Sequence, residues 1–275
     1  MDGVKEYYLR DKDALAYFGR KADPEFWDRH WSMQDVRKAV RACREDAWFV
    51  PAVRRFLPPG KRVLEGGCGM GHLVHALTCQ GYRAVGLDNA RRTVSIVHES
   101  APELDILAGD VRSLPFLDES FDGYVSAGVI EHFWEGYGAV LEEMRRVLRP
   151  GGFLFVSFPH MSPLRRLKRR LGRYLLEGAM PEGFYQFALH RERVLRDFEA
   201  RGFVCRDRIP YDGLKGLKDE VGFLKPLLQP VYDGKSLRRL RPWLDRLSLP
   251  FASHMMLLVL QKAGGHDKGR EIGRE

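Results

Sequence analysis

The sequence has few cysteines and no hydrophobic run long enough to cross a bilayer. Its 275 residues include four cysteines, none of them in a C-x-x-C pair: Cys43, Cys68, Cys79 and Cys205. The first six residues lack the apolar core of a signal peptide. The apolar run at residues 254–260 is too short to span a membrane. We therefore expect a reduced, cytoplasmic protein.

The chain also has fewer acidic than basic residues, and it has no internal repeat. It contains 45 lysines and arginines against 37 aspartates and glutamates, a formal net charge of +8 with a pI near 9.4. This balance favours anionic partners and leaves nucleic acid open. However, we find no separate RNA-binding module and no low-complexity arm. A hydrophobic content of 44% is enough for one sizeable core, so we expect one α/β domain with appendages.

The most informative segment is residues 63–71, which read VLEGGCGMG and lead directly into HLVHAL. The pattern predicts a strand, a tight turn and a helix. Glycines alternate at Gly67, Gly69 and Gly71, where side chains would keep a ligand away from the backbone. The turn is therefore a candidate binding loop.

The spacing of these glycines argues against a dinucleotide. A pyrophosphate-binding turn needs G-x-G-x-x-G, and from Gly67 the third glycine would fall at His72. In addition, the carboxylate of Glu65 would repel phosphates but suits a cationic group such as an ammonium or a sulfonium. A cationic nucleoside fits this turn better than a dinucleotide does.

Three later segments predict further strands that end in acidic or small residues. Residues 83–88 end at Asp88, about twenty residues after the first glycine, where an α/β nucleotide site places the acid for ribose hydroxyls. Residues 106–111 contain Asp110, and residues 121–128 end in small residues. Because parallel strands end at the same edge of a sheet, these residues are expected to share one site.

These motifs resemble the class I S-adenosylmethionine-dependent methyltransferases, in particular the small-molecule group (methyltransferase type 11) that includes quinone-biosynthesis enzymes. The resemblance is dense over roughly residues 50 to 160. It rests on the glycine turn with Glu65, on Asp88, and on the segments GDVRSLPF (109–116), FD (121–122), VIEH (129–132) and EMRRVLRPGG (143–152).

The resemblance implies an α/β, Rossmann-like, doubly wound sheet of seven strands, mostly parallel, with an antiparallel last strand inserted beside residues 204–209. We expect an N-terminal helical lid (1–50) and a cofactor-binding core (51–158). A substrate lid (159–253) with a helix at 191–201 and a strand at 203–209 follows. The last strand (254–262) and a disordered tail (263–275) complete the chain.

The implied cofactor is S-adenosylmethionine. Glu65 and the glycine loop would surround its methionine part. Asp88 would bind the ribose hydroxyls, and Asn89 would lie at the edge of the adenine. Asp110 and Val111 would meet the adenine, and Ala127 would close the methionine end. The cofactor-binding residues expected from the resemblance are Glu65, Gly66, Gly67, Cys68, Gly69, Gly71, Asp88, Asn89, Asp110, Val111 and Ala127.

A sulfonium is an activated methyl donor, so catalysis is expected to depend on in-line alignment and on exclusion of water. His132, at the end of the fourth predicted strand, is the candidate general base. Alternatively, it orients the substrate or holds the loop. Its neighbour Glu131 could cap the following helix. His72 and His75 lack the partner pattern of a metal site, and we expect no metal.

The variable parts say less about the substrate. Trp27, His30 and Trp31 could form a lid or simply fill a core. Residues 161–176 show leucines at helical spacing between six basic residues, with no acid until Glu177, which indicates a basic amphipathic helix. It could hold an anionic substrate, meet anionic lipid or pack on the core. Candidate substrate residues are Trp27, His30, Trp31, Arg165, Arg169 and Tyr185.

A methyltransferase acting on a small molecule, lipophilic or anionic, is the favoured interpretation. The leucine–arginine mixture recurs in residues 223–247, which favours a lipophilic substrate or a membrane-surface site. A transfer RNA methyltransferase and a cofactor-binding regulatory subunit without activity are the alternatives. The acceptor atom and the oligomeric state do not follow from the sequence.

Overall fold

The computed structural model describes residues 4–32, 48–176, 182–234 and 237–264. Cys43 and residues 265–275 of the expected tail lie outside the described residues. Within the described residues, no helix combines the length and hydrophobicity needed to cross a bilayer.

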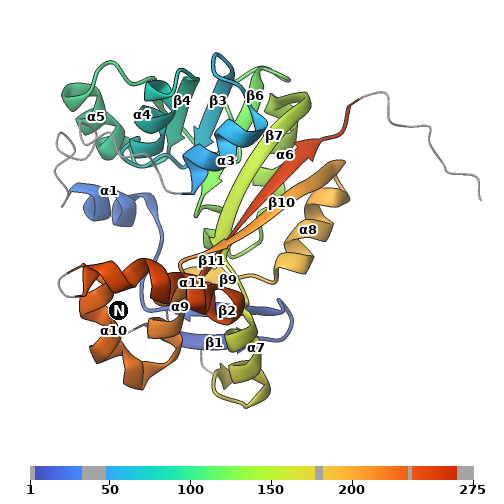
Figure 1. The fold of residues 1–275 in the computed structure, drawn as a ribbon. Coiled ribbons are helices and arrows are strands. Elements are labelled where there is room, and N and C mark those ends of the chain that lie inside the picture. Colours follow the sequence, from blue (N-terminus) through green and yellow to red (C-terminus); the bar gives the residue numbers. More distant parts are fainter. Residues whose placement is uncertain (1–3, 33–47, 177–181, 235–236, 265–275) are drawn as a thin grey trace, which may run out of the picture.

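A seven-stranded mixed sheet forms the centre of the molecule (Figure 1). Its strand order is β10-β11-β7-β6-β3-β4-β5, and the five strands from β7 to β5 are parallel. Their bounds are β3 Arg62–Gly66, β4 Arg83–Asp88, β5 Ile106–Ala108, β6 Phe121–Ala127, β7 Leu148–Pro159, β10 Phe203–Tyr211 and β11 Met255–Lys262. The last strand, β11, lies antiparallel between β7 and β10. The predicted fold class is confirmed.

Two hydrophobic cores cover the two faces of this sheet, because neighbouring strand residues point to opposite sides. Val63 and Leu257 belong to one core, with α3 Phe49–Phe56, α4 His72–Cys79 and α5 Arg91–Ser100. Leu64 and Leu258 belong to the other, with α6 Gly138–Val147 and α8 Arg191–Glu199. The strands are therefore apolar on both faces, as expected of a doubly wound sheet.

Residues 4–18 are not helical, so the expected helical lid over 1–50 is wrong for this segment. β1 Lys5–Leu9 and β2 Ala14–Phe18 form a hairpin, and its turn uses Asp13 in a left-handed conformation (φ 44°). β2 pairs with β9 Phe184–Ala188, and β1 pairs with β8 Leu175–Leu176. This second sheet buries all of β2, a burial that an isolated amphipathic helix would not provide. Helix α1 Pro24–Ser32 follows.

Helix α7 is shorter than the predicted amphipathic segment 161–176, and the side that it packs on the protein carries an arginine instead of its leucines. It spans Pro163–Arg170 and ends before Gly172, which has a φ of 63°. Arg165 is fully buried, whereas Leu167 and Leu171 are exposed. The guanidinium of Arg165 binds the carboxylate of Glu220 at 2.7 Å. This ion pair holds Arg165 inward, while Arg169 and Arg170 stay exposed beside Leu167 and Leu171, so these two leucines do not pack on the core.

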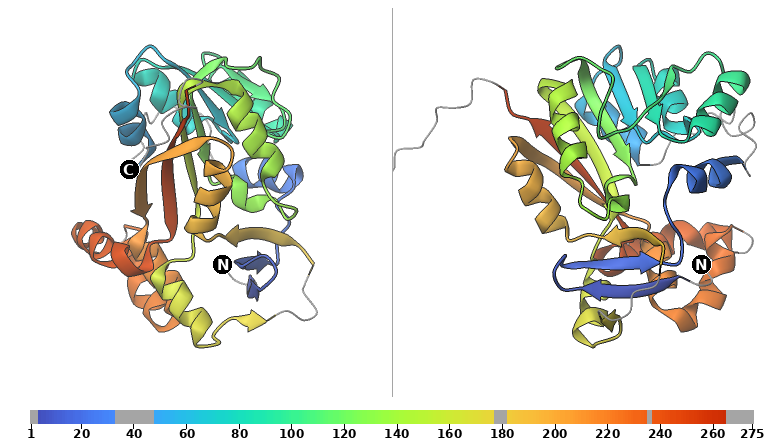
Figure 2. Two further views of the ribbon diagram at one scale, coloured as in Figure 1. Left: turned by 90° about the vertical axis from the view of Figure 1, so that its right-hand side faces the viewer. Right: turned by 180° about the vertical axis from the view of Figure 1, so that it is seen from behind.

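Three helices form a unit at the carboxyl end of β10: α9 Gly213–Glu220, α10 Lys225–Tyr232 and α11 Arg241–Ala252, with the 3-10 turns Gly222–Leu224 and Arg238–Leu240. The small sheet, α7 and this unit lie below the large sheet in Figure 1, and α1 lies between the two parts in both Figure 1 and Figure 2. Two glycines let the backbones of α9 and α11 touch. A Cβ on Gly216 would come within 1.6 Å of the Ala252 carbonyl oxygen.

Gly216→Ala is therefore expected to lower the free energy of unfolding by about 1–3 kcal/mol, because the backbone of α11 must move away. Gly222→Ala is the matched control, since no atom of the described residues lies within 4 Å of its Cβ position. Urea unfolding of both variants measures the difference. Equal stability of the two variants would show that α9 and α11 do not pack as closely as described.

Candidate functional site

A cavity of about 140 Å³ lies where the parallel strands end. It is bounded by the ends of β3 to β6 and by α1. Six of the predicted cofactor residues line it: Gly67, Asp88, Asn89, Asp110, Val111 and Ala127. Trp27, Trp31 and His132 line it as well. The structure thus brings the acidic strand ends, the glycine turn and the candidate base together.

The glycine turn adopts backbone conformations that favour glycine. Gly67, Gly69 and Gly71 have φ values of 79°, 51° and 74°. The N–H of Gly67 donates to the carbonyl of Leu87 at 2.8 Å, which ties the turn to the end of β4. Gly71 then begins α4.

Asp88 holds this turn from the neighbouring strand. One carboxylate oxygen accepts the N–H of Gly69 at 2.7 Å, and the other accepts the N–H of Ala90 at 2.9 Å. Burial raises the pKa of Asp88, while these two hydrogen bonds oppose the rise. Asp88 therefore shapes the loop and still presents its remaining lone pairs to the cavity.

The other loop residues, Glu65, Gly66, Cys68, Gly69 and Gly71, are not among those that line the cavity. A Cβ on Gly66 would lie 2.0 Å from the hydroxyl oxygen of Tyr124, so this glycine is required by packing. Burial raises the pKa of the Cys68 thiol well above its usual value, and the thiol stays protonated. Glu65 is buried at the end of β3. A direct contact of these residues with a cofactor stays a prediction.

Arg112 is a cavity residue that the sequence reasoning missed. Its guanidinium donates to both oxygens of Asp110, at 2.6 to 3.0 Å, and these bonds lower the pKa of Asp110. Arg112 also lies over the ring of Phe133, with 5.7 Å from its guanidinium carbon to the ring centroid. The available signal was its position two residues after Asp110 in the GDVR segment.

Helix α1 covers the cavity and is fixed at its first turn and at its middle. The carboxylate of Asp23 accepts the N–H of Phe26 at 2.8 Å, which closes the first turn. Asp28 accepts both the N–H and the hydroxyl of Thr93, at 2.8 and 3.0 Å, and so attaches α1 to α5. Trp31 lies on the glycine turn, where a Cβ on Gly69 would come 2.8 Å from the indole.

An aromatic cluster joins α1 to the candidate base. The ring of Trp27 packs edge to face on His132 at 5.0 Å, and Tyr185 packs on His132 at 5.3 Å. His30 contacts Phe26 and Trp31. Of the predicted substrate residues, Trp27, His30, Trp31 and Tyr185 therefore come together around His132.

His132 has a defined tautomer. Its Nδ1 donates to the carbonyl of Tyr185 at 2.7 Å, because only a protonated nitrogen can donate to a carbonyl. Nε2 then carries the lone pair. Burial lowers the pKa of His132 to about 4, so the ring is neutral near pH 7. This side chain can accept a proton at Nε2.

Glu131 does not cap a helix, contrary to expectation. It lies in the 3-10 turn Ile130–His132, and α6 begins only at Gly138. The side chain is buried, and its Oε2 has no hydrogen-bond partner among the described residues. Burial raises the pKa of Glu131 to about 8. The sequence shows a glutamate next to His132, but it gave no indication that the carboxyl of Glu131 would be neutral near pH 7.

The two predicted substrate arginines do not reach the cavity. Arg165 is buried between α7, α9 and β11, where it binds Glu220, the carbonyl of His160 and the ring of His254. Arg169 lies over the ring of Tyr8, with 4.4 Å to the centroid. In this structure they stabilise packing around α7.

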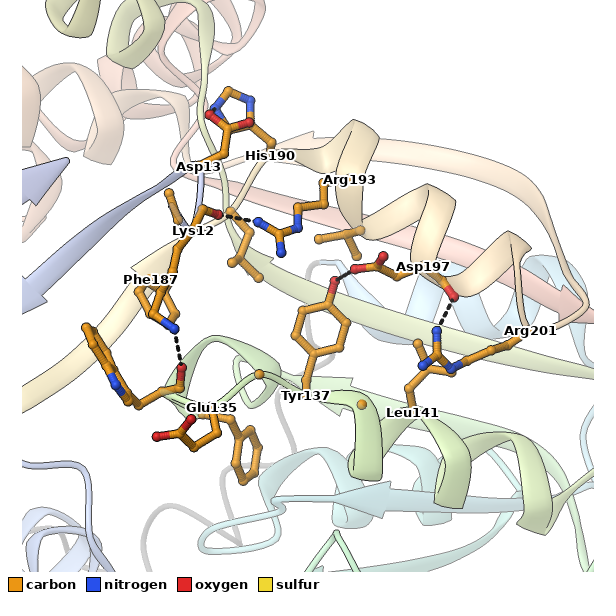
Figure 3. A pocket seen from close by; sticks show the side chains of 17 residues that line it. Lys12, Asp13, Glu135, Tyr137, Leu141, Phe187, His190, Arg193, Asp197 and Arg201 are labelled. Atoms are coloured by element: carbon orange, nitrogen blue, oxygen red, sulfur yellow. Dashed lines mark hydrogen bonds and ion pairs between the residues drawn. The ribbon is translucent and has the colours of Figure 1, made fainter. Parts of the chain in front are cut away.

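A larger cavity of about 240 Å³ lies beyond Phe133, between the β1–β2 turn and α8 (Figure 3). Several of its polar side chains bind one another or the backbone. Tyr137 donates to Asp197 at 2.5 Å, and Arg193 donates to the carbonyl of Lys12. Because the glycine turn and the acidic strand ends are absent from its lining, we assign the functional site to the smaller cavity.

Comparison with known proteins agrees with this geometry. Residues 64–156 match the family described as "Methyltransferase domain". Over 101 residues, 37% of this chain and 39% of the relative, the chain is 41% identical to a probable S-adenosylmethionine-dependent methyltransferase of Mycolicibacterium smegmatis. The predicted resemblance to class I methyltransferases is confirmed.

Two further relatives differ in their named acceptors. A probable phthiotriol/phenolphthiotriol dimycocerosates methyltransferase 2 of Mycobacterium ulcerans is 32% identical over 54% of this chain and 57% of its own length. A probable tRNA methyltransferase 9B of Mus musculus is 31% identical over 61% of this chain and 39% of its own. The chain therefore spans less than two thirds of these relatives.

A solved structure shares the fold. The 1,6-didemethyltoxoflavin-N1-methyltransferase of Burkholderia thailandensis superposes with a TM-score of 0.54 at 15% identity, covering 94% of this chain and 99% of the other. At this identity the likeness concerns the fold alone.

Glu131→Gln is expected to stabilise the protein increasingly as the pH rises from about 5 to 8. The unfolded-state carboxyl ionises near 4.5 and the folded one near 8, so the wild type loses stability across that window, whereas glutamine does not. Urea unfolding at several pH values should show the gain grow by about 1.4 kcal/mol per pH unit at most. The exposed Glu135→Gln is the control. Parallel pH dependence in both variants would contradict the buried neutral state.

Proposed function

We propose that this chain, whose residues 64–156 form a class I S-adenosylmethionine-dependent methyltransferase domain, transfers a methyl group to a lipophilic or anionic small molecule. The observation that carries the proposal is the convergence of the glycine turn, Asp88 and His132 on one cavity beneath an aromatic lid. The reaction is an in-line displacement. When bound, S-adenosylmethionine supplies the activated methyl group on its sulfonium.

The residues around the cavity fit this cofactor. Asp88 has lone pairs left for the ribose hydroxyls after accepting two backbone N–H groups. Asn89 would lie at the edge of the adenine, and Asp110 and the N–H of Val111 would bind the adenine. The carboxylate of Asp110 would then be shared between the adenine and Arg112. Glu65, the Gly66–Gly71 turn and Ala127 would surround the methionine part. Negative charge at the strand ends favours a positively charged donor.

The acceptor side of the site is aromatic. Trp27 and Trp31 line the cavity, Tyr185 packs on His132, and His132 is half-buried among these rings. Nε2 of His132 would accept the proton that a hydroxyl or acidic carbon loses, and the rings would exclude water. This lining, together with the lipid acceptor in the name of the M. ulcerans relative, supports a lipophilic substrate.

Two other interpretations remain as alternatives. A transfer RNA substrate is supported by the net charge of +8 and by the name of the mouse relative. A non-catalytic cofactor-binding subunit is the second. A cytoplasmic location and a membrane contact through residues 161–176 also stay predictions.

A transfer assay separates these interpretations. The protein is incubated with S-adenosylmethionine labelled in its methyl group and with either a lipid extract or bulk RNA. We expect label in solvent-extractable material, and none with Asp88→Asn, which weakens the hold on both the loop and the ribose. Label confined to RNA would overturn the small-molecule proposal. No transfer, with calorimetric binding of the cofactor intact, would favour the regulatory subunit.

His132→Ala is expected to lower kcat by about a hundredfold or more while leaving cofactor affinity nearly unchanged, because a positioned general base is lost. For the wild type, kcat should be level between about pH 6 and 7, below the ionisation of the neighbouring Glu131, and fall as the pH approaches 4, where the imidazole gains a proton. His75→Ala, which changes a histidine of α4 that does not line the cavity, is the control. Wild-type kcat in His132→Ala would refute the role of His132 as base.

A further inference from the structure

Exposed apolar side chains are concentrated in two segments of the molecule. Of the fourteen large apolar side chains that the described residues leave exposed, eleven lie within residues 167–176 and 223–251. The second segment contributes seven, which we call the α10–α11 surface: Phe223, Leu227, Leu237, Leu240, Trp243, Leu247 and Phe251. Phe223 is 83% exposed and Trp243 is 71% exposed. Such a concentration indicates an interaction surface.

Helix α11 has one packed side and one unpartnered side. Ser248 and Ala252 are buried, and the backbone of α11 at these positions contacts Gly213 and Gly216 of α9. Leu240, Trp243, Leu247 and Phe251 recur at a spacing of three or four residues and are exposed. The exposed stripe is therefore not needed to hold α11 on the protein, because the opposite side does so.

Basic residues surround this stripe. Arg239, Arg241 and Arg246 are exposed, and none of them forms an ion pair within the described residues. The one acid in residues 237–251 is Asp245, which is half-buried and accepts the N–H of Leu214 at 3.0 Å. Residues 237–251 are therefore apolar and cationic on their exposed side, and the exposed acid within residues 223–251 is Asp233, just after α10.

The neighbouring helix α7 has the same character. Leu167 and Leu171 are exposed beside Arg169 and Arg170, and residues 163–176 contain no acid. α7 follows the carboxyl end of β7, and α11 ends just before Met255, which pairs with Pro159 at that same end. Both helices therefore lie at the edge of the sheet where the parallel strands end, which is also the edge that carries the glycine turn.

We propose that the α10–α11 surface docks on an anionic phospholipid bilayer, with its apolar side chains in the interface and its arginines against the phosphates. A protein partner of ordinary composition would bury the leucines but leave the arginines without a matching charge. An anionic lipid surface satisfies both, and tryptophan and arginine are suited to the boundary between headgroups and acyl chains. The inference concerns the surface and does not depend on methyl transfer.

Co-sedimentation with vesicles tests the proposal. The full chain is mixed with vesicles of equal parts phosphatidylglycerol and phosphatidylcholine, or of phosphatidylcholine alone. We expect binding to the anionic vesicles at least about tenfold stronger, and weaker as salt rises. Trp243→Ser/Leu247→Ser should lower this binding about tenfold or more, since the apolar contribution is lost. Arg241→Gln/Arg246→Gln should reduce both the binding and its salt dependence.

The matched control is Leu117→Ser, which replaces an exposed leucine (83% exposed) near Arg146, away from both segments. It should bind vesicles as the wild type does. Circular dichroism and calorimetric binding of S-adenosylmethionine should be unchanged in all variants, because α11 does not line the cofactor cavity.

Any one of three results would overturn the proposal. The first is that the wild type fails to bind anionic vesicles, and the second is that the serine variant binds them as well as the wild type does. The third is that light scattering shows a dimer of the wild type that the serine variant abolishes. The last result would assign the surface to a second copy of this chain. Failure of methyl transfer would leave the vesicle result unchanged, so the two proposals fail separately.

Discussion

The site depends on one carboxylate, that of Asp88. Its two oxygens accept the N–H groups of Gly69 and Ala90, so a single side chain at the end of β4 holds the turn after β3 in place. The same turn has positive φ values at three glycines, and it could relax in isolation. The hydrogen bonds that Asp88 and Leu87 accept from backbone N–H groups of the turn select one conformation of it. The carboxylate that we propose to bind the ribose hydroxyls is thus also the group that shapes the glycine turn.

The covering of the site depends on contacts from elsewhere in the chain. α1 reaches the cavity because Asp28 binds Thr93 on α5, and this places Trp31 on Gly69 and Trp27 on His132. The ring of His132 is oriented by the hydrogen bond that its Nδ1 donates to the carbonyl of Tyr185. Burial lowers the pKa of His132 to about 4 and raises the pKa of Glu131 to about 8. Between these two pH values both neighbouring side chains are therefore neutral.

The lower part of the molecule is organised by a buried ion pair. Arg165 of α7 binds Glu220 of α9 at 2.7 Å, and Lys168 and Tyr174 bind the same carboxylate. The pKa of Glu220 is lowered, because the attraction of Arg165 and Lys168 outweighs the opposing effect of burial. With Arg165 of α7 directed inward and α11 held by close backbone contact, Leu167, Leu171, Trp243 and Leu247 remain exposed.

The sequence by itself determined the central sheet, the glycine turn and the acids at the strand ends. These follow from apolar runs, glycine spacing and strand-end residues, each of which is local, and Asp88, Asp110 and Ala127 lie where the pattern placed them. Three features were decided only by tertiary structure: the N-terminal hairpin, the burial of Arg165 and the neutral Glu131. Leu15 of β2 pairs with Ala188 of β9, 173 residues later, and Arg165 binds a carboxylate 55 residues later. Helical periodicity in residues 1–50 and 161–176 could not anticipate such partners, because long-range pairing overrides a local amphipathic pattern.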